Sequence, residues 1–114
     1  MKKTTIDPAT IVQRQVDAYN NLDIEAFTDV FSDDVCVKQF PDTPLIEGKA
    51  NFRIHYQLMF EATPDLHCEI VMRMTQGNTV IDQENVLKNG EYIKAIAIYH
   101  VNESQIESVT FILE

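Results

Sequence analysis

The chain has 114 residues, of which 45% are hydrophobic and 24% charged, and this length and composition suit one compact domain with one core. Its uncharged apolar stretches are far shorter than the ~20 residues that a membrane-spanning helix needs. Eighteen Asp and Glu residues against nine Lys and Arg residues give a formal net charge of -9, which repels phosphate backbones and anionic lipid surfaces. We therefore expect a single domain over residues 1–114 that binds neither nucleic acid nor membranes.

The N-terminus and the cysteines bear on cellular location and on metal chemistry. Residues 1–5 contain two lysines, but Asp7-Pro8 follows in place of an apolar run, so we expect no secretory signal and a cytoplasmic location. Cys36 and Cys68 have no CxxC or Cys/His ligand spacing, and the three histidines have no HxH or HExxH spacing. We expect reduced structural thiols, no metal and, because three glycines cannot supply a nucleotide-binding loop, no cofactor.

Two helices are predicted first along the chain. Residues 7–8, Asp-Pro, are typical of an N-cap followed by proline at the first helical position. Apolar residues then recur every three or four positions, and the helix is expected to end near residues 20–21. Asp23 is a second N-cap, and the short apolar stripe that follows it stops around residues 32–34. The two helices should form a hairpin.

A short extended segment and a third helix are predicted next. Residues 35–40 are extended, and residues 41–44, with two prolines, are predicted to be a loop that continues neither as a strand ladder nor as a helix. Gly48 opens the third helix, whose apolar side includes Tyr56. This helix ends before residues 63–65 because the residue before a proline disfavours helical geometry.

The second half of the chain is predicted to be β. Four runs rich in Ile, Val, Met and Tyr cover residues 66–76, 79–87, 92–101 and 106–113. Gly77-Asn78 and Asn89-Gly90, between the first three runs, are two-residue hairpin signals. Helices followed by a meander of strands indicate an α+β fold, in which three N-terminal helices pack on one face of a curved antiparallel sheet.

The two turns also predict which residues share a face of the sheet. Counting back from each turn gives two registers that agree about faces. One face should carry Val71, Arg73, Val80, Asp82, Glu84, Ala95, Ala97 and Tyr99. The other should carry Met72, Met74, Ile81, Gln83, Ile96 and Ile98. Both faces are too apolar to lie in water, so we expect helices on the first and a second copy of the chain on the second. The predicted partner is thus a homodimer through Met72, Met74, Ile96 and Ile98.

The first face mixes charged residues with small alanines. Helices lying over small residues leave a void, so this face predicts an apolar pocket with a polar floor that takes a hydrophobic small molecule. One guanidinium cannot neutralise two carboxylates in such a pocket, so one carboxylate should hold a proton more readily and act as general acid or base. The candidate catalytic residues are Asp82, Glu84, Arg73 and Tyr56. Alternatively, Arg73 and Asp82 form a cross-strand ion pair that holds the register, or the carboxylates face water at a rim.

The order of elements resembles the nuclear transport factor 2 superfamily, and more closely its SnoaL-like and ketosteroid-isomerase-like small bacterial proteins. The resemblance covers about residues 11–111 and is carried by AYNNLDIEAFTDVFSDDV, residues 48–60, PDLHCEI, GNTVIDQENV and AIAIYHV. It implies a cone-shaped barrel with a pocket between the concave sheet and the helices, commonly dimeric. That fold hosts isomerases, cyclases, epoxide hydrolases, dehydratases and non-catalytic binders, so it does not imply one activity.

The resemblance also implies where a ligand would bind. The catalytic positions of ketosteroid isomerases fall on Gln15, Gln39 and about Ala97, so the familiar isomerase mechanism is not expected here. Only the helix-three tyrosine of their hydrogen-bond network has a counterpart, Tyr56. The expected ligand-binding residues are Tyr99, His55, Gln15, Gln39, Phe27 and Phe60. Adjacent helical residues do not share a face, so Tyr56 is preferred to His55 as the residue that points into the pocket, although Tyr56, Phe27 and Phe60 also suit plain core positions.

Two functions from different classes follow from this sequence. The first is a small cofactor-independent isomerase, cyclase or hydrolase acting on a lipophilic ketone, enol or epoxide. In it Asp82 or Glu84 is the acid or base, Arg73 the orienting group and Tyr56 the hydrogen-bond donor. The second is a ligand-binding or dimeric assembly module without chemistry.

Overall fold

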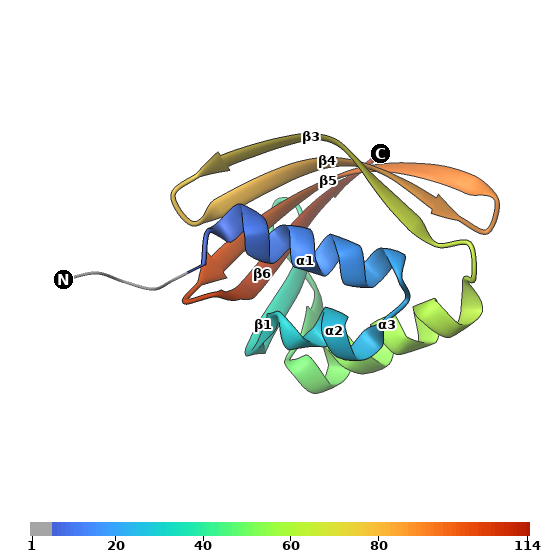
Figure 1. Ribbon diagram of the computed structural model, residues 1–114, viewed down its shortest axis with the longest axis horizontal. Coiled ribbons are helices and arrows are strands. Elements are labelled where there is room, and N and C mark those ends of the chain that lie inside the picture. The colour runs from blue at the N-terminus through green and yellow to red at the C-terminus, as the bar shows by residue number, and fades with distance from the viewer. Residues whose placement is uncertain (1–5) are drawn as a thin grey trace.

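Three helices cover one face of a six-stranded sheet in the computed structural model, which describes residues 6–114 (Figure 1). The helices are α1 (Pro8–Asn20), α2 (Ile24–Asp29) and α3 (Lys49–Ala62). The strands are β1 (Phe31–Gln39), β2 (Thr43–Glu47), β3 (His67–Gln76), β4 (Thr79–Lys88), β5 (Glu91–Asn102) and β6 (Gln105–Leu113). The predicted α+β fold is confirmed. The prediction of no secretory signal concerns residues 1–5, which lie outside the described residues.

The sheet has the strand order β2-β1-β6-β5-β4-β3 and is curved around the helices without closing into a complete barrel (Figure 1). Its pairings are antiparallel except for β1 and β6, which run parallel. Within residues 6–114, β2 and β3 each pair with one strand, so in this part of the chain both edges of the sheet are open. None of the helices within residues 6–114 has the length and hydropathy needed to cross a bilayer.

The helix starts lie where the capping residues predict them. Pro8 occupies the first turn of α1, and the Asp23 side chain accepts a hydrogen bond of 3.1 Å from the backbone N–H of Ala26 at the start of α2. The predicted end of the second helix at residues 32–34 is wrong, because α2 ends at Asp29. Phe31 instead joins β1, where it is buried and pairs with β6.

One strand, β2, was missed in the sequence. Residues 41–44 are not simply a loop, because β2 begins at Thr43 and contains Pro44. Proline is tolerated in this strand because β2 is the outermost strand of the sheet, where a missing N–H can face away from its neighbour. A register shift between Val37 and Lys38 of β1 lies beside the proline.

The hairpin registers are confirmed at β4 and β5. Asn89 and Gly90 both have positive φ, 54° and 81°, and Lys88 pairs with Glu91 beside them. As predicted from that turn, three pairs lie directly opposite each other: Glu84 and Ala95, Asp82 and Ala97, and Val80 and Tyr99. These six residues share the face of the sheet that is buried against the helices.

The predicted register of β3 holds only near its turn. Arg73 lies opposite Asp82, as expected, but a β-bulge between Ile70 and Met72 places Ile70 opposite Glu84. Val71 is therefore not on the inner face, and 58% of its surface is exposed. A bulge inserts one residue, so every side chain before it changes face relative to a regular strand.

Aromatic packing fills the space between the sheet and the helices. The Phe27 ring of α2 packs against five other aromatic rings, and its centroid lies 4.9 Å from that of Tyr56. Its other ring neighbours are Tyr19, Phe31, Phe52 and Phe60. Such offset and edge-on ring pairs add to the stabilisation from burial.

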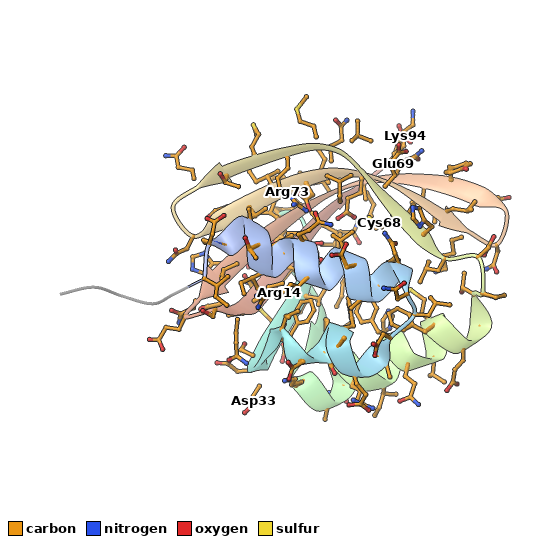
Figure 2. All side chains as sticks on the ribbon, viewed as in Figure 1. Arg14, Asp33, Cys68, Glu69, Arg73 and Lys94 are labelled. Carbon is orange, nitrogen blue, oxygen red and sulfur yellow. The ribbon has the colours of Figure 1, made fainter. Side chains whose placement is uncertain are left out.

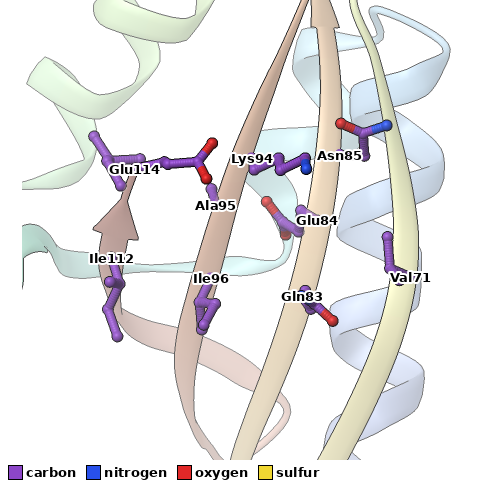
Figure 3. A pocket seen from close by; sticks show the side chains of 10 residues that line it. Val71, Gln83, Glu84, Asn85, Lys94, Ala95, Ile96, Ile112 and Glu114 are labelled. Carbon is purple, nitrogen blue, oxygen red and sulfur yellow. The ribbon is translucent and has the colours of Figure 1, made fainter.

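The outer face of the sheet is exposed and apolar. Met72 and Met74 expose 60% and 57% of their surfaces. A hollow of about 390 Å³ crosses this face, where Figure 3 shows Ile112, Ile96 and Val71 on neighbouring parts of the sheet. The face thus has the composition that the homodimer prediction requires, and the dimer itself stays a prediction.

Asp65 fastens the β4–β5 turn to the segment between α3 and β3. Its two carboxylate oxygens accept hydrogen bonds of 3.0 and 2.8 Å from the backbone N–H groups of Asn89 and Gly90. These two bonds, the one from Gly90 most, hold the pKa of Asp65 below its ordinary value. The contribution to stability is therefore present above the ordinary carboxyl pKa and is lost on acidification.

Replacing Asp65 with alanine is expected to loosen this turn without unfolding the protein. The amide hydrogens of Asn89 and Gly90 should exchange with solvent at least several-fold faster, as measured by NMR, because both lose their acceptor. Glu61→Ala, at an exposed position of α3, is the control. Unchanged exchange in Asp65→Ala would contradict the role given to this carboxylate.

Candidate functional site

A cavity of about 440 Å³ lies between the inner face of the sheet and the helices. Most of its wall is apolar and comes from α2, α3 and the strands β1, β5 and β6. The polar residues that line it are Gln15, Tyr19, His55, Tyr56, Cys68, Glu84, Lys88 and Tyr99. An apolar cavity with a few convergent polar groups is the usual form of a small-molecule site.

Glu84 is the carboxylate of this cavity. It lies on β4, only 5% of its surface is exposed, and the Tyr99 hydroxyl donates a hydrogen bond of 3.2 Å to its Oε2 atom. Burial, and next the negative charge of nearby Asp82, raise the pKa of Glu84 from 4.5 to about 7, against the opposing effects of Tyr99, Cys68 and Arg73. At neutral pH Glu84 is therefore poised between its charged and its protonated form.

Three tyrosines surround this carboxyl group. Burial is the main cause that raises the pKa of each of Tyr19, Tyr56 and Tyr99, and the charge of Glu84 adds to it. Each phenol therefore stays protonated and can donate a hydrogen bond at neutral pH. Tyr99 donates to Glu84, whereas the Tyr56 hydroxyl has no hydrogen-bond partner within residues 6–114. Tyr56 is thus the free donor beside Glu84.

Arg73 and Asp82 lie outside the cavity. Arg73 Nε and Nη2 donate to the two oxygens of Asp82 at 2.6 and 2.9 Å, and Arg73 Nη1 donates to Gln13 Oε1 at 2.9 Å. Asp82 is fully buried, and Figure 2 shows Arg73 where β3 passes α1. This bidentate pair connects two strands to the first helix, which fits the alternative of a structural cross-strand ion pair.

The structure therefore divides the four predicted catalytic residues. Glu84 and Tyr56 line the cavity, whereas Arg73 and Asp82 form a pair beside it. Asp82 still acts on the cavity through its charge, because it raises the pKa of Glu84. The catalytic hypothesis thus concerns Glu84 and Tyr56, and the alternative of a structural ion pair concerns Arg73 and Asp82.

The predicted ligand-binding residues are placed as follows. Tyr99, Gln15, Phe27 and His55 line the cavity. Partial burial of the His55 ring, and next the charge of Lys88, hold the pKa of His55 below its ordinary value. The other two predicted residues, Gln39 and Phe60, are not among those that line the cavity. Gln39 is exposed at the end of β1, and Phe60 is buried with its ring centroid 5.6 Å from that of Tyr19.

Three polar residues of the cavity were missed in the sequence: Tyr19, Cys68 and Lys88. Tyr19 follows the apolar stripe of α1, a signal that identifies a buried position and nothing more. Cys68 reaches the inner face, opposite Val86, only because the bulge shifts the first half of β3. A regular strand would have placed its thiol on the outer face, so the pattern of the sequence could not have found it.

The described residues give no indication of a bound metal. Within residues 6–114 no group of three or more His, Cys, Asp or Glu side chains is arranged to hold a metal ion. Burial raises the pKa of the Cys68 thiol, with Glu84 and Asp82 adding to the effect, so this thiol is protonated at neutral pH.

Solved structures share this fold across most of the chain. An uncharacterized cystatin fold protein from Novosphingobium aromaticivorans is 23% identical, with a TM-score of 0.88 over 94% of this chain and 98% of that chain. An LEH-like epoxide hydrolase from M. tuberculosis is 13% identical, with a TM-score of 0.81 over 98% and 86%. A protein proposed to be a SnoaL-like polyketide cyclase, from Jannaschia sp. CCS1, is 11% identical, with a TM-score of 0.79 over 100% and 91%. At these identities the likeness concerns the fold alone.

The sequence itself gives the family. No functionally curated protein matches it. Residues 12–109 match the SnoaL-like domain, a stretch that runs from α1 to β6 and includes every polar residue of the cavity wall. The resemblance seen in the sequence is thereby confirmed, and the chain belongs to the SnoaL-like domain family.

Proposed function

We propose that the protein is a cofactor-independent enzyme that moves a proton on a lipophilic ketone, enol or epoxide bound in this cavity. In the proposal Glu84 is the general acid or base and Tyr56 the hydrogen-bond donor. The observation that carries it is the placement of one buried carboxyl group, beside a free tyrosine hydroxyl, in the wall of an otherwise apolar cavity. That neighbourhood also adjusts the pKa of Glu84 to neutral pH, where proton transfer by a single group is most efficient.

The steps follow from the two groups. The Glu84 carboxylate takes a proton from the carbon next to the ligand carbonyl, and the resulting enolate oxygen accepts a hydrogen bond from Tyr56. The protonated Glu84 then returns the proton to another carbon, or to the same one, and the enzyme is restored. With an epoxide, the same carboxylate takes a proton from a water molecule whose oxygen bonds to one ring carbon as the bond from that carbon to the epoxide oxygen breaks. The Tyr56 hydroxyl hydrogen-bonds the resulting alkoxide oxygen, and the protonated Glu84 then gives its proton to that oxygen. Arg73 and Asp82 act from outside the cavity by setting the charge near Glu84.

A ligand-binding protein without chemistry is the second candidate. It is favoured because Arg73 and Asp82 pair with each other and not with a group in the cavity. Within residues 6–114, Glu84 is then the one carboxylate in the cavity wall. Such a protein would bind the same lipophilic molecules and return them unchanged.

Deuterium exchange separates the two candidates. The protein is incubated in D₂O with a panel of ketones, 2-tetralone and 2-decalone among them, and mass spectrometry follows the uptake of deuterium next to the carbonyl. The enzyme hypothesis predicts catalysed uptake that Glu84→Gln reduces by about 10²- to 10⁴-fold, the usual contribution of a general base. Tight binding without catalysed uptake would favour the binding protein.

The proposal includes a homodimer through the outer face of the sheet, because that face is apolar and unpaired within the described chain. This outer face also carries charged residues of both signs, because Lys94 and Glu114 border the hollow that Figure 3 shows. Sedimentation should show a dimer for the wild type and a monomer for Met72→Lys, because an isologous contact would meet the new charge twice. Gln57→Lys, on an exposed position of α3, should remain dimeric. A monomeric wild type would contradict the dimer.

A further inference from the structure

Gln15 is a polar residue where α1 is otherwise apolar. The buried face of this helix consists of Ile11, Val12, Val16 and Ala18, and Gln15 lies among them with only 6% of its surface exposed. It lines the cavity, and its side-chain oxygen Oε1 is buried with no hydrogen-bond partner within residues 6–114. Burying an amide oxygen without a partner is destabilising, so a leucine or methionine would suit the fold better.

The other glutamine of the same helix provides a contrast. Gln13, on the exposed side, donates a hydrogen bond of 2.9 Å to Asp17 and accepts one of 2.9 Å from Arg73. Both ends of its amide are thus used by the protein. Gln15 has neither of these partners, and its side chain borders the cavity.

We propose that Gln15 recognises a hydroxyl group, so that the ligand of this cavity is a hydroxylated lipophilic molecule such as an enol or a hydroxyketone. An amide presents both a donor and an acceptor, and a hydroxyl group can pair with either of them. A simple ketone or an epoxide only accepts hydrogen bonds and would leave Oε1 unpaired. The inference rests on the proposed function for the cavity and restricts its ligands to those that carry a hydroxyl group.

Three matched probes test this selectivity in the full-length protein. They are 2-naphthol, which donates and accepts a hydrogen bond, 2-methoxynaphthalene, which only accepts, and 2-methylnaphthalene, which does neither. Calorimetric titration should show wild-type affinity for 2-naphthol about 5- to 10-fold above that for the other two, the usual effect of one neutral hydrogen bond. Gln15→Leu should bind all three alike, whereas Gln57→Leu, on an exposed position of α3, should keep the preference.

Further variants separate this inference from the chemistry assigned to Glu84. Glu84→Gln should lose catalysed deuterium uptake and keep the preference for 2-naphthol, because Gln15 is intact. A preference that persists in Gln15→Leu, or a wild type that binds the three probes equally or not at all, would overturn the inference and leave the test of Glu84 chemistry unaffected.

Thermal unfolding without any ligand gives an independent check. Gln15→Leu should melt at a higher temperature than the wild type, because the variant removes a buried acceptor that the protein leaves unpaired. A lower melting temperature would assign Gln15 a structural role and overturn the inference.

Discussion

Replacing Arg73 with leucine is expected to destabilise the protein by about 3–5 kcal/mol, the usual cost of leaving a buried carboxylate without its partner. Asp82 is fully buried and receives two hydrogen bonds from the Arg73 guanidinium, at 2.6 and 2.9 Å. Without them the Asp82 carboxylate stays in the protein interior without its cationic partner. Urea unfolding of the variant and the wild type at pH 7 measures the difference.

An ion pair at the surface provides the matched control. Arg53 of α3 pairs with Glu25 of α2 in a solvent-exposed position, so Arg53→Leu should change stability little. Adding Asp82→Asn to Arg73→Leu should recover much of the lost stability, because it removes the buried charge. Equal, small effects of Arg73→Leu and Arg53→Leu would contradict the structural role of the Arg73–Asp82 pair.

Replacing Glu84 with glutamine is expected to change how stability depends on pH. In the folded protein the pKa of Glu84 rises from 4.5 to about 7, so between these values the folded state holds a proton that the unfolded state has released. Stability contributed by this group therefore falls as pH rises from 4.5 through 7. The shift corresponds to a loss on the order of 3 kcal/mol. Glu84→Gln does not ionise and should escape that loss.

The measurement is urea unfolding of both proteins at several values between pH 4 and pH 8. The stability of Glu84→Gln relative to the wild type should rise across that range and level off above pH 7. Glu69→Gln, at an exposed position of β3, should follow the wild-type curve at every pH. Parallel curves for Glu84→Gln and the wild type would show that Glu84 ionises equally in both states and would contradict its assigned role.

Local signals in the sequence predicted much of the fold. Proline and aspartate caps located the helix starts, and the Asn89-Gly90 turn fixed the pairing of β4 with β5. That register alone placed Glu84 and Tyr99 on the buried face. Both kinds of signal depend on backbone geometry that a few adjacent residues determine, which is why they could be read without the structure.

Long-range geometry explains what the sequence did not reveal. The bulge beside Val71 has no local marker, yet it exposes Val71 and brings Cys68 to the cavity. Strand alternation predicts a face but not a position along it, so it could not separate Asp82 from Glu84 or foresee that Gln39 lies outside the cavity. These placements depend on how the helices lie over the sheet.

The most direct test of the account is an NMR titration of the Glu84 carboxyl carbon in selectively ¹³C-labelled protein, with Glu84→Gln used to assign the signal. The account predicts a midpoint near pH 7, because burial and the charge of Asp82 disfavour the carboxylate, and a resonance that Glu84→Gln removes. A midpoint near 4.5, the ordinary value, would mean that Glu84 is charged throughout the neutral range and would contradict its role as the acid or base of this cavity.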